Sequence, residues 1–393
     1  MIQSFTLFTA EIDDAGVAVP EILAQLDEKD ALLKNSIGLL HCYSDFIESG
    51  VVKALSEALP FDILGATTLG TATQGSEELA ELTILVLTSD DVEFVTGLSA
   101  PISEEDAGII ADACAQAASA AGQTGEKPAL MINYAPLLMN VGGDFFVKAA
   151  TAATGGAPVF GTLAIDDNLD YHDSQVLYKG DAYKDRLAFL LLFGEVTPKF
   201  YLASISKEKV LRDKGVVTGA SGNQLREIND VSVSDYLTSI GLTKDEDGAI
   251  SGINAHPFVV DYNDGTVPVV RIMFAITPEG YAVCGGDIPV GATLLVGSID
   301  GDDVVRATAE RLDEILAGEK PNALLIFSCV GRYFSLGYNT SREADEVSSM
   351  LDGTGIPYTL SYSAGELCPA QSTEGNADLT NRFHNDTFIV CAL

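Results

Sequence analysis

Basic residues are scarce in this sequence. Among 393 residues there are only 22 Lys and Arg against 57 Asp and Glu, so the formal net charge is −35. Binding to nucleic-acid phosphates or to anionic lipid headgroups needs clustered Lys and Arg. We therefore expect no nucleic-acid partner and no attachment to a membrane. Apolar residues make up 47% and charged residues 20% of the chain, a composition that excludes disorder and predicts a folded, acidic protein.

Other features are missing as well. No run of about 18 apolar residues occurs, so no membrane-spanning helix is expected, and the first residues lack the basic and apolar regions of a secretory signal. Trp is absent, the six Cys form no C-x-x-C pair, and no two of the four His lie close in sequence. We therefore expect neither a metal site nor a disulfide framework. Scattered thiols in a chain of this length predict a cytoplasmic protein.

Three segments repeat the order strand, helix, strand. Each begins with a short apolar run, at residues 37–41, 129–133 and 323–327, and ends in a second strand followed by small residues. Runs this apolar are typical of strands that are buried on both faces of a parallel sheet. Strand, crossover helix and parallel strand form the βαβ unit. In the third unit Thr340 and Glu343 match a capping box, which predicts a helix start there.

Longer apolar segments lie between these units. Residues 82–89 and 92–99 are predicted to pair as an antiparallel hairpin, and so are residues 186–193 and 199–206, because turn residues separate the members of each pair. Together with the βαβ units, these strands predict an α/β fold, mixed α/β and α+β, in which mixed β-sheets are flanked by helices.

Start and stop residues predict two further helices, at residues 103–122 and 302–318. A glycine-rich and locally basic stretch without regular periodicity occupies residues 208–223. We interpret this stretch as the boundary between two domains, residues 1–212 and residues 213–393, because a chain of this length exceeds the usual size of a single core.

Two turns in the amino-terminal half carry polar side chains. Residues 65–75 contain the G-x-x-x-x-G frame of a phosphate-binding loop, but Thr71 stands where that motif requires Lys. A tight structural turn is one interpretation; in another, Thr67, Thr68 and backbone N–H groups hold a small anion such as a carboxylate. Asp166 begins an acidic loop that lacks the Gly and Glu of a calcium site, so it is either solvated or a polar contact to a ligand.

The last seventy residues bring polar side chains to strand ends. Cys329 and Arg332 follow the third apolar run, Glu366 follows the neighbouring strand, and His384 and Asn385 precede the final strand. Parallel neighbours place such loops at one edge of the sheet, where open α/β sheets bind ligands. We therefore predict that these five side chains converge.

Three interpretations of this cluster are open. In the first, Arg332 and Glu366 form a structural ion pair. In the second, Arg332 binds the carboxylate of a small polar ligand and Glu366 accepts a hydrogen bond from its amine. In the third, Cys329 is the nucleophile and His384 the base of a hydrolase. We expect a binding protein without catalytic activity, because a Cys at the end of a buried strand is more often inert packing.

These motifs resemble those of the FIST family of sensory proteins. The matching segments are FSCVGR at residues 327–332, GELCP at 365–369 and FHNDT at 383–387, with two further segments at residues 61–72 and 222–237. The resemblance extends over nearly the whole chain as paired FIST-N and FIST-C domains. It implies a module of intracellular signal transduction that binds a small polar ligand such as an amino acid.

The resemblance also bears on cofactors and partners. Some bacterial relatives are described as haem-binding nitric oxide sensors, so haem is an alternative ligand, with His384 or Cys368 as its axial donor. Relatives are often joined to signalling output domains; none is recognised in this sequence, so a separate output protein is the expected partner. Ala66 stands where relatives often carry Cys, which argues against a thiol role in that turn.

Overall fold

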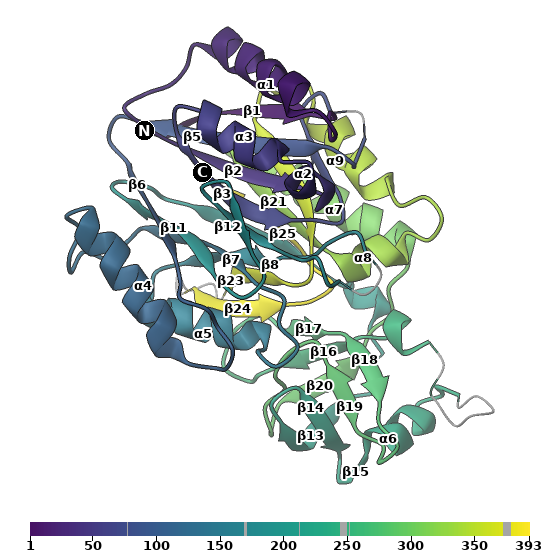
Figure 1. Cartoon of the computed structure of the whole chain (residues 1–393). Coiled ribbons are helices and arrows are strands. Elements are labelled where there is room, and N and C mark those ends of the chain that lie inside the picture. Colours follow the sequence, from purple (N-terminus) through teal and green to yellow (C-terminus); the bar gives the residue numbers. More distant parts are fainter. Residues whose placement is uncertain (77, 169–170, 212, 244–249, 251, 372–378) are drawn as a thin grey trace.

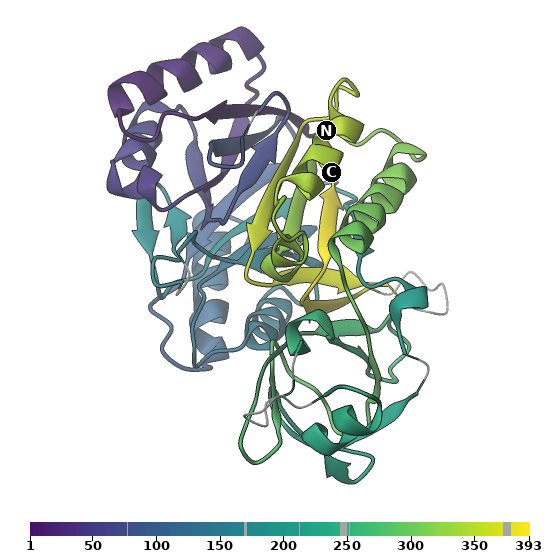
Figure 2. The ribbon, with the colours of Figure 1, turned by 90° about the vertical axis from the view of Figure 1, so that its right-hand side faces the viewer.

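The computed structural model describes residues 1–76, 78–168, 171–211, 213–243, 250, 252–371 and 379–393. Figures 1 and 2 show a large body of β-sheets with helices on its outside and a smaller body, drawn in green, beneath it. No helix in the described residues is long and apolar enough to cross a membrane.

The large body contains the same four-stranded unit three times. In each unit an edge strand pairs antiparallel with a second strand, the second pairs antiparallel with a central strand, and the central strand pairs parallel with a fourth. In that order the units are β1 (Gln3–Thr9), β5 (Leu82–Ser89), β2 (Asn35–Cys42) and β3 (Asp62–Thr67); β6 (Glu93–Leu98), β11 (Ala188–Phe193), β7 (Leu130–Ala135) and β8 (Val159–Leu163); and β12 (Lys199–Ala203), β25 (Phe388–Ala392), β21 (Leu324–Cys329) and β22 (Tyr358–Ser363).

Each unit carries its own helices on the outer face (Figure 1). An Asp side chain (Asp14, Asp106 or Asp300) accepts a hydrogen bond from a backbone N–H in the first turn of the first helix of each unit, which satisfies a donor that the helix itself leaves free. The helices are α1 (Ala15–Lys29), α2 (Asp45–Glu48) and α3 (Val51–Ala58); α4 (Ala107–Ala120) and α5 (Gly143–Ala153); and α7 (Gly301–Leu316), α8 (Val330–Ser335) and α9 (Arg342–Leu351). The predicted helices at residues 103–122 and 302–318 are confirmed as α4 and α7.

Each unit also gives one strand to the sheet of another unit. The strand β4 (Thr71–Thr73) leaves the first unit and pairs with β22 of the third. The strand β23 (Glu366–Ala370), extended by β24 (Thr380–His384), leaves the third unit and pairs with β8 of the second. The strand β9 (Val176–Tyr178), extended by β10 (Asp181–Tyr183), leaves the second unit and pairs with β3 of the first. This cyclic exchange binds the three sheets together.

The inner faces of the three sheets enclose one apolar core, to which strands of all three units contribute. His41, Tyr134 and Phe327 occupy corresponding positions on the three central strands, and their ring centroids lie 5.5 to 6.2 Å apart. Burial lowers the pKa of His41 to about 3, so its imidazole is neutral at physiological pH. The three rings therefore fill the middle of the large body.

The smaller body is inserted between β12 and α7, and we call it the insert. Its strands follow the order β17-β16-β20-β13-β14-β19-β18, with β15 paired to β14. Its elements are β13 (Gly215–Ser221), β14 (Gln224–Ile228), β15 (Val231–Ser232), α6 (Val233–Ser239), the 3-10 helix η2 (Ile253–Ala255), β16 (Phe258–Asp261), β17 (Val269–Arg271), β18 (Met273–Ile276), β19 (Ala282–Cys284) and β20 (Thr293–Val296), and the 3-10 helix η1 (Lys207–Lys209) lies in the segment that leads into it.

The expected fold class is confirmed: mixed sheets, built on three βαβ units, are flanked by helices. Two local predictions are wrong. The strands β5 and β6 do not pair with each other, nor do β11 and β12; β5 pairs with β1 and β2, β6 with β11, and β12 with β25. Strands on both sides of residue 212 share two of the sheets, and the boundary at residues 212 and 213 stays a prediction.

Candidate functional site

The eight side chains predicted to form the site are all buried, none more than 2% exposed. Several lie where the carboxyl ends of the three parallel strand pairs meet. There the backbone N–H of Ile165 donates to the carbonyl of Thr67 over 3.3 Å, and the Thr68 hydroxyl lies 2.8 Å from the carbonyl of Tyr362. None of the eight lines one of the four principal cavities of the described chain.

Arg332 lies inside a buried network of hydrogen bonds, in which only its Nη1 finds no acceptor among the described residues. Its Nη2 lies 2.6 Å from Oε1 of Glu343 and 2.8 Å from the hydroxyl of Thr308, and it also donates to the carbonyl of Val304 over 3.0 Å. The other carboxylate oxygen of Glu343 accepts from Ser328 over 2.7 Å. Arg332 and Glu343 are both 0% exposed, so this is a structural ion pair.

The ion-pair interpretation had the right chemistry and the wrong partner, because Arg332 pairs with Glu343 and not with Glu366. Glu343 was assigned to a capping box with Thr340, and that assignment is also wrong. The helix α9 begins at Arg342 after Ser341, and no side chain caps it. The Glu343 side chain turns inward to the guanidinium instead.

Glu366 lies in a second closed arrangement. Its two carboxyl oxygens accept hydrogen bonds from Ser363 and Thr387, each over 2.7 Å. Burial raises the pKa of Glu366 to about 8, although hydrogen bonds from Ser363, Thr387 and Cys329 act in the opposite direction. Burial likewise raises the pKa of the Cys329 thiol well above its ordinary value, so the thiol is protonated at neutral pH.

His384 and Asn385 follow in the same interior. The Nε2–H of His384 donates to the carbonyl of Cys368 over 3.0 Å, and burial lowers the pKa of this imidazole to about 3. Asn385 lies against the insert: a Cβ atom added to Gly285 would stand 2.5 Å from Asn385 Oδ1. Neither His384 nor Cys368 faces a principal cavity, so the arrangement adds no support to haem binding, which stays a prediction.

The remaining predicted side chains hold loops in place. The hydroxyl of Thr67 lies 3.2 Å from the carbonyl of Gln175 and accepts from the backbone N–H of the same residue over 2.8 Å. Asp166 accepts from the backbone N–H of Asn168 over 2.8 Å and from the hydroxyl of Ser174 over 3.0 Å. A role of Thr67, Thr68 and Asp166 in binding a ligand stays a prediction.

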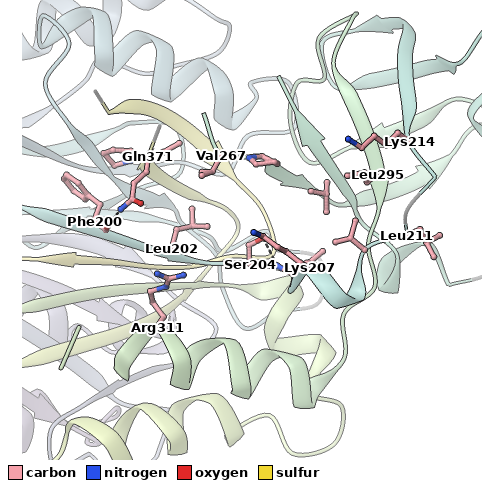
Figure 3. A pocket seen from close by; sticks show the side chains of 16 residues that line it. Phe200, Leu202, Ser204, Lys207, Leu211, Lys214, Val267, Leu295, Arg311 and Gln371 are labelled. Carbon is pink, nitrogen blue, oxygen red and sulfur yellow. Dashed lines mark hydrogen bonds between the residues drawn. The ribbon is translucent and has the colours of Figure 1, made fainter. Parts of the chain in front are cut away.

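A cavity with room for a small molecule lies elsewhere, at the junction of the large body and the insert, and we call it the junction cavity (Figure 3). Its volume is about 710 Å³, within the range of small-molecule sites. The large body contributes β12, β23 and α7, and the insert contributes β16, β20 and the segment before β17. The lining residues are Phe200, Leu202, Ser204, Ile205, Lys207, Val210, Leu211, Lys214, Val259, Val267, Pro268, Leu295, Arg311, Pro369, Ala370 and Gln371.

The charged residues of the junction cavity all have the same sign. Lys207, Lys214 and Arg311 line it, together with no acidic side chain among the described residues. Neither lysine has an ion-pair partner within the described part of the chain. Arg311 donates from Nη1 to Glu314 on its own helix, but its buried Nε finds no acceptor there. In a chain of net charge −35, three cations around one apolar cavity are an unusual concentration.

A second contact, which we call the clasp, joins the insert to the large body. Arg271 of β17 is 0% exposed, and its Nη2 lies 3.2 Å from Oδ1 of Asp144 on α5 and 2.7 Å from the hydroxyl of Tyr262. The other oxygen of Asp144 accepts from the backbone N–H of Asp287 over 2.8 Å. A cavity of about 380 Å³ adjoins these residues. The clasp fixes one contact between the two bodies.

Sequence reasoning missed the junction cavity because its residues come from separate segments that share no motif. One signal was available. Residues 208–223 are locally basic in an acidic chain, and this stretch was interpreted only as a domain boundary. Lys214 lies within it, and Lys207 lies immediately before it.

Two family models match the chain in tandem. The FIST N domain matches residues 36–231 and the FIST C domain matches residues 233–369. No curated protein matches the sequence. Among solved structures, a cyanuric acid hydrolase from A. caulinodans is 11% identical, with 100% of this chain and 99% of that chain covered and a TM-score of 0.37. A chorismatase is 10% identical over 100% and 99% of the two chains, with a TM-score of 0.31. Similarities this distant carry no argument about chemistry.

Proposed function

The chain belongs to the FIST family, whose domains are sensors in signal transduction, and on that premise we propose that it is a receptor without catalytic activity. In this proposal a small molecule binds in the junction cavity and changes how the insert lies against the large body. The observation that carries the proposal is the cavity itself, because its walls come from both bodies and a ligand would contact both at once.

The connection between the two bodies suits such a role. Two chain segments link the large body and the insert, and these two segments contact each other. The N–H of Leu211 donates to the carbonyl of Val296 over 2.8 Å, and the N–H of Ser298 donates to the carbonyl of Lys209 over 2.9 Å. The first segment also lines the junction cavity, through six of its residues from Ser204 to Lys214. A ligand that prefers one arrangement of the two bodies shifts their equilibrium by its difference in affinity.

The buried cluster supports a receptor more than a hydrolase. A nucleophilic Cys must ionise and must lie beside its base. The Cys329 thiol has a raised pKa, and the His384 imidazole donates to the carbonyl of Cys368 instead. All six Cys are free and buried, which supports the reducing environment of the cytoplasm as the site of action. We propose that a separate output protein detects the change at the insert.

A tryptophan reporter tests ligand binding. Because the chain has no Trp, Leu211→Trp places a single indole at the cavity, at a position that is already 43% exposed. Phe334→Trp, on α8 and 53% exposed, is the matched control away from the cavity. A panel of organic acids, amines, alcohols and amino acids should contain a compound that shifts the emission of the first variant and leaves that of the second unchanged.

The same compound should raise the melting temperature of the wild-type chain, because a ligand at 100 times its Kd stabilises the native state by about 2.7 kcal/mol. A panel in which no compound alters either signal would remove the junction cavity from consideration as a receptor site.

A further inference from the structure

We infer that the junction cavity selects an amphipathic organic anion, a molecule with an apolar body and a single carboxylate or similar head. This inference rests on the proposed function and goes further, because it names the chemical class of the ligand. Two observations carry it: the apolar walls, and the three cations that line the cavity with no acidic side chain among the described lining residues.

The apolar walls come from both bodies. Leu202 on β12 faces this space from the large body, while Val259 on β16 and Leu295 on β20 face it from the insert. These three side chains are only partly buried, so apolar surface stays exposed between the two bodies. Covering such surface is favourable in proportion to its area, and each methylene of a ligand that enters should raise affinity about threefold to fourfold.

The cations make the electrostatic potential of the cavity positive. Figure 3 shows Arg311 and Lys214 at opposite ends of the view, with Lys207 between them beside Ser204. The buried Nε–H of Arg311 lacks an acceptor within the described residues. A buried donor without a partner is costly, and an anionic oxygen is the strongest acceptor that a ligand can bring to it. The cavity is therefore complementary to an anion.

The same composition discriminates against other classes. An amino acid carries an ammonium group, which needs a carboxylate or several carbonyl oxygens as its partners. No acidic side chain lines the junction cavity among the described residues, and an alkylamine would meet only like charge there. A neutral alcohol would fill the apolar part and bring no anionic group to the cations. The expected order of affinity is carboxylate, then alcohol, then amine and amino acid.

Isothermal titration calorimetry of the full chain tests this order. The probes are hexanoate, octanoate and decanoate, octyl sulfate, octanol, octylamine and leucine, each below its aggregation concentration. We expect affinity to rise from hexanoate to decanoate and octanoate to bind at least tenfold more tightly than octanol. Octyl sulfate distinguishes a general anion site from one that requires a carboxylate; binding of either anion in preference to octanol supports the inference.

Charge variants locate the head group. Arg311→Gln removes the buried Nε–H and should weaken octanoate binding about fivefold to tenfold; Lys214→Met, on the other side of the cavity, acts only through the field of its charge and should weaken it about twofold to threefold, and raised salt should weaken binding in the wild type. Lys199→Met is the control, because Lys199 lies on β12 outside the cavity and pairs with Glu319. Equal loss in the control variant would overturn the assignment of the head group to this cavity.

The outcomes separate the two proposals. Tight binding of octanol, octylamine or leucine in preference to every anion would overturn the inference and leave the receptor function standing. Failure of every probe class, here and in the wider panel, would overturn both. An indole emission of the Leu211→Trp variant that depends on protein concentration in the absence of any probe would assign the cavity to a second copy of the chain, and would also overturn the inference.

Discussion

The buried cluster around Arg332 and the junction cavity are the two places where this chain concentrates unusual side chains, and they differ in one physical respect. In the cluster, Arg332 and Glu343 are 0% exposed and bind each other; Nη1 of Arg332 finds no acceptor among the described residues, but none of the four principal cavities reaches it. In the cavity, Lys207 and Lys214 are exposed without ion-pair partners in the described chain, beside about 710 Å³ of space. Polar side chains that converge form a ligand site only when they leave room for the ligand.

The largest expected effect on stability comes from a substitution that breaks the buried ion pair of the cluster. Arg332→Ala leaves Glu343 buried without its cation, and loss of one partner of a buried ion pair typically lowers the free energy of unfolding by about 3–5 kcal/mol. Urea denaturation followed by circular dichroism measures this change. Arg342→Ala is the matched control, because Arg342 pairs with Asp302 near the surface and its loss should change stability by about 0.5 kcal/mol or less.

A double substitution checks the physical cause. Arg332→Met combined with Glu343→Leu removes both charges, and apolar replacement of a buried pair is often close to neutral. We expect the double variant to recover at least half of the stability lost in Arg332→Ala. A double variant as unstable as the single one would contradict the explanation by an uncompensated charge.

The next effect concerns pH. The pKa of Glu366 rises to about 8 from an ordinary value of 4.5, because burial disfavours the charged form. Between these two values the unfolded chain releases a proton that the native chain keeps. This group therefore lowers the free energy of unfolding by about 1.4 kcal/mol per pH unit as pH rises from 4.5 to 8, and adds no further change above 8.

Other buried groups also affect how the free energy of unfolding depends on pH. Asp386, with its pKa raised by burial to about 7, acts in the same direction as Glu366. His384 and His41, with pKa values lowered by burial to about 3 from 6.5, act in the opposite direction and destabilise the native state as pH falls from 6.5 to 3. The contribution of Glu366 alone is therefore best isolated between pH 7 and 8.

Glu366→Gln should make the decline in stability between pH 7 and 8 shallower, by up to about 1.4 kcal/mol per pH unit. Urea denaturation at several pH values measures the two slopes. Glu105→Gln, an exposed position before α4, is the control and should keep the wild-type slope. An unchanged slope in Glu366→Gln would show that Glu366 ionises normally and that the cluster is open to water.

The smallest effect on stability is expected in the cavity. Lys214 is exposed and has no ion-pair partner among the described residues, so Lys214→Met should change the free energy of unfolding by about 0.5 kcal/mol or less. The same variant is expected to bind the anionic probes more weakly than the wild type does. A loss of stability comparable to that of Arg332→Ala would erase the distinction between the two regions.

Some of this arrangement was predictable from local patterns. The three apolar runs are the central strands β2, β7 and β21. A short segment that is apolar at every position is typical of a strand whose sheet is covered on both faces. The helices α4 and α7 also follow from their start and stop residues. The hairpins were wrongly predicted because the pairing of β5 with β2 and of β12 with β25 is set by contacts between residues far apart in sequence, which short-range turn signals do not report.

The partners within the candidate site could not be predicted for a related reason. Glu343 fits a capping box by spacing, but the buried guanidinium of Arg332 is a stronger partner than a backbone N–H at an exposed helix end. The ion pair that results depends on how α8 and α9 pack above β21. A sequence pattern shows which charged residues are present but does not show which of them form ion pairs.

The amino-acid sequence by itself determined the acidic character of the protein, its three βαβ units and the family to which it belongs, because these depend on composition and on short patterns. Tertiary structure alone decided the cyclic exchange of strands, the pairing of Arg332 with Glu343 and the position of the junction cavity. These features join segments as distant as Leu202 and Gln371, and only the packing of the whole chain brings such segments within contact distance.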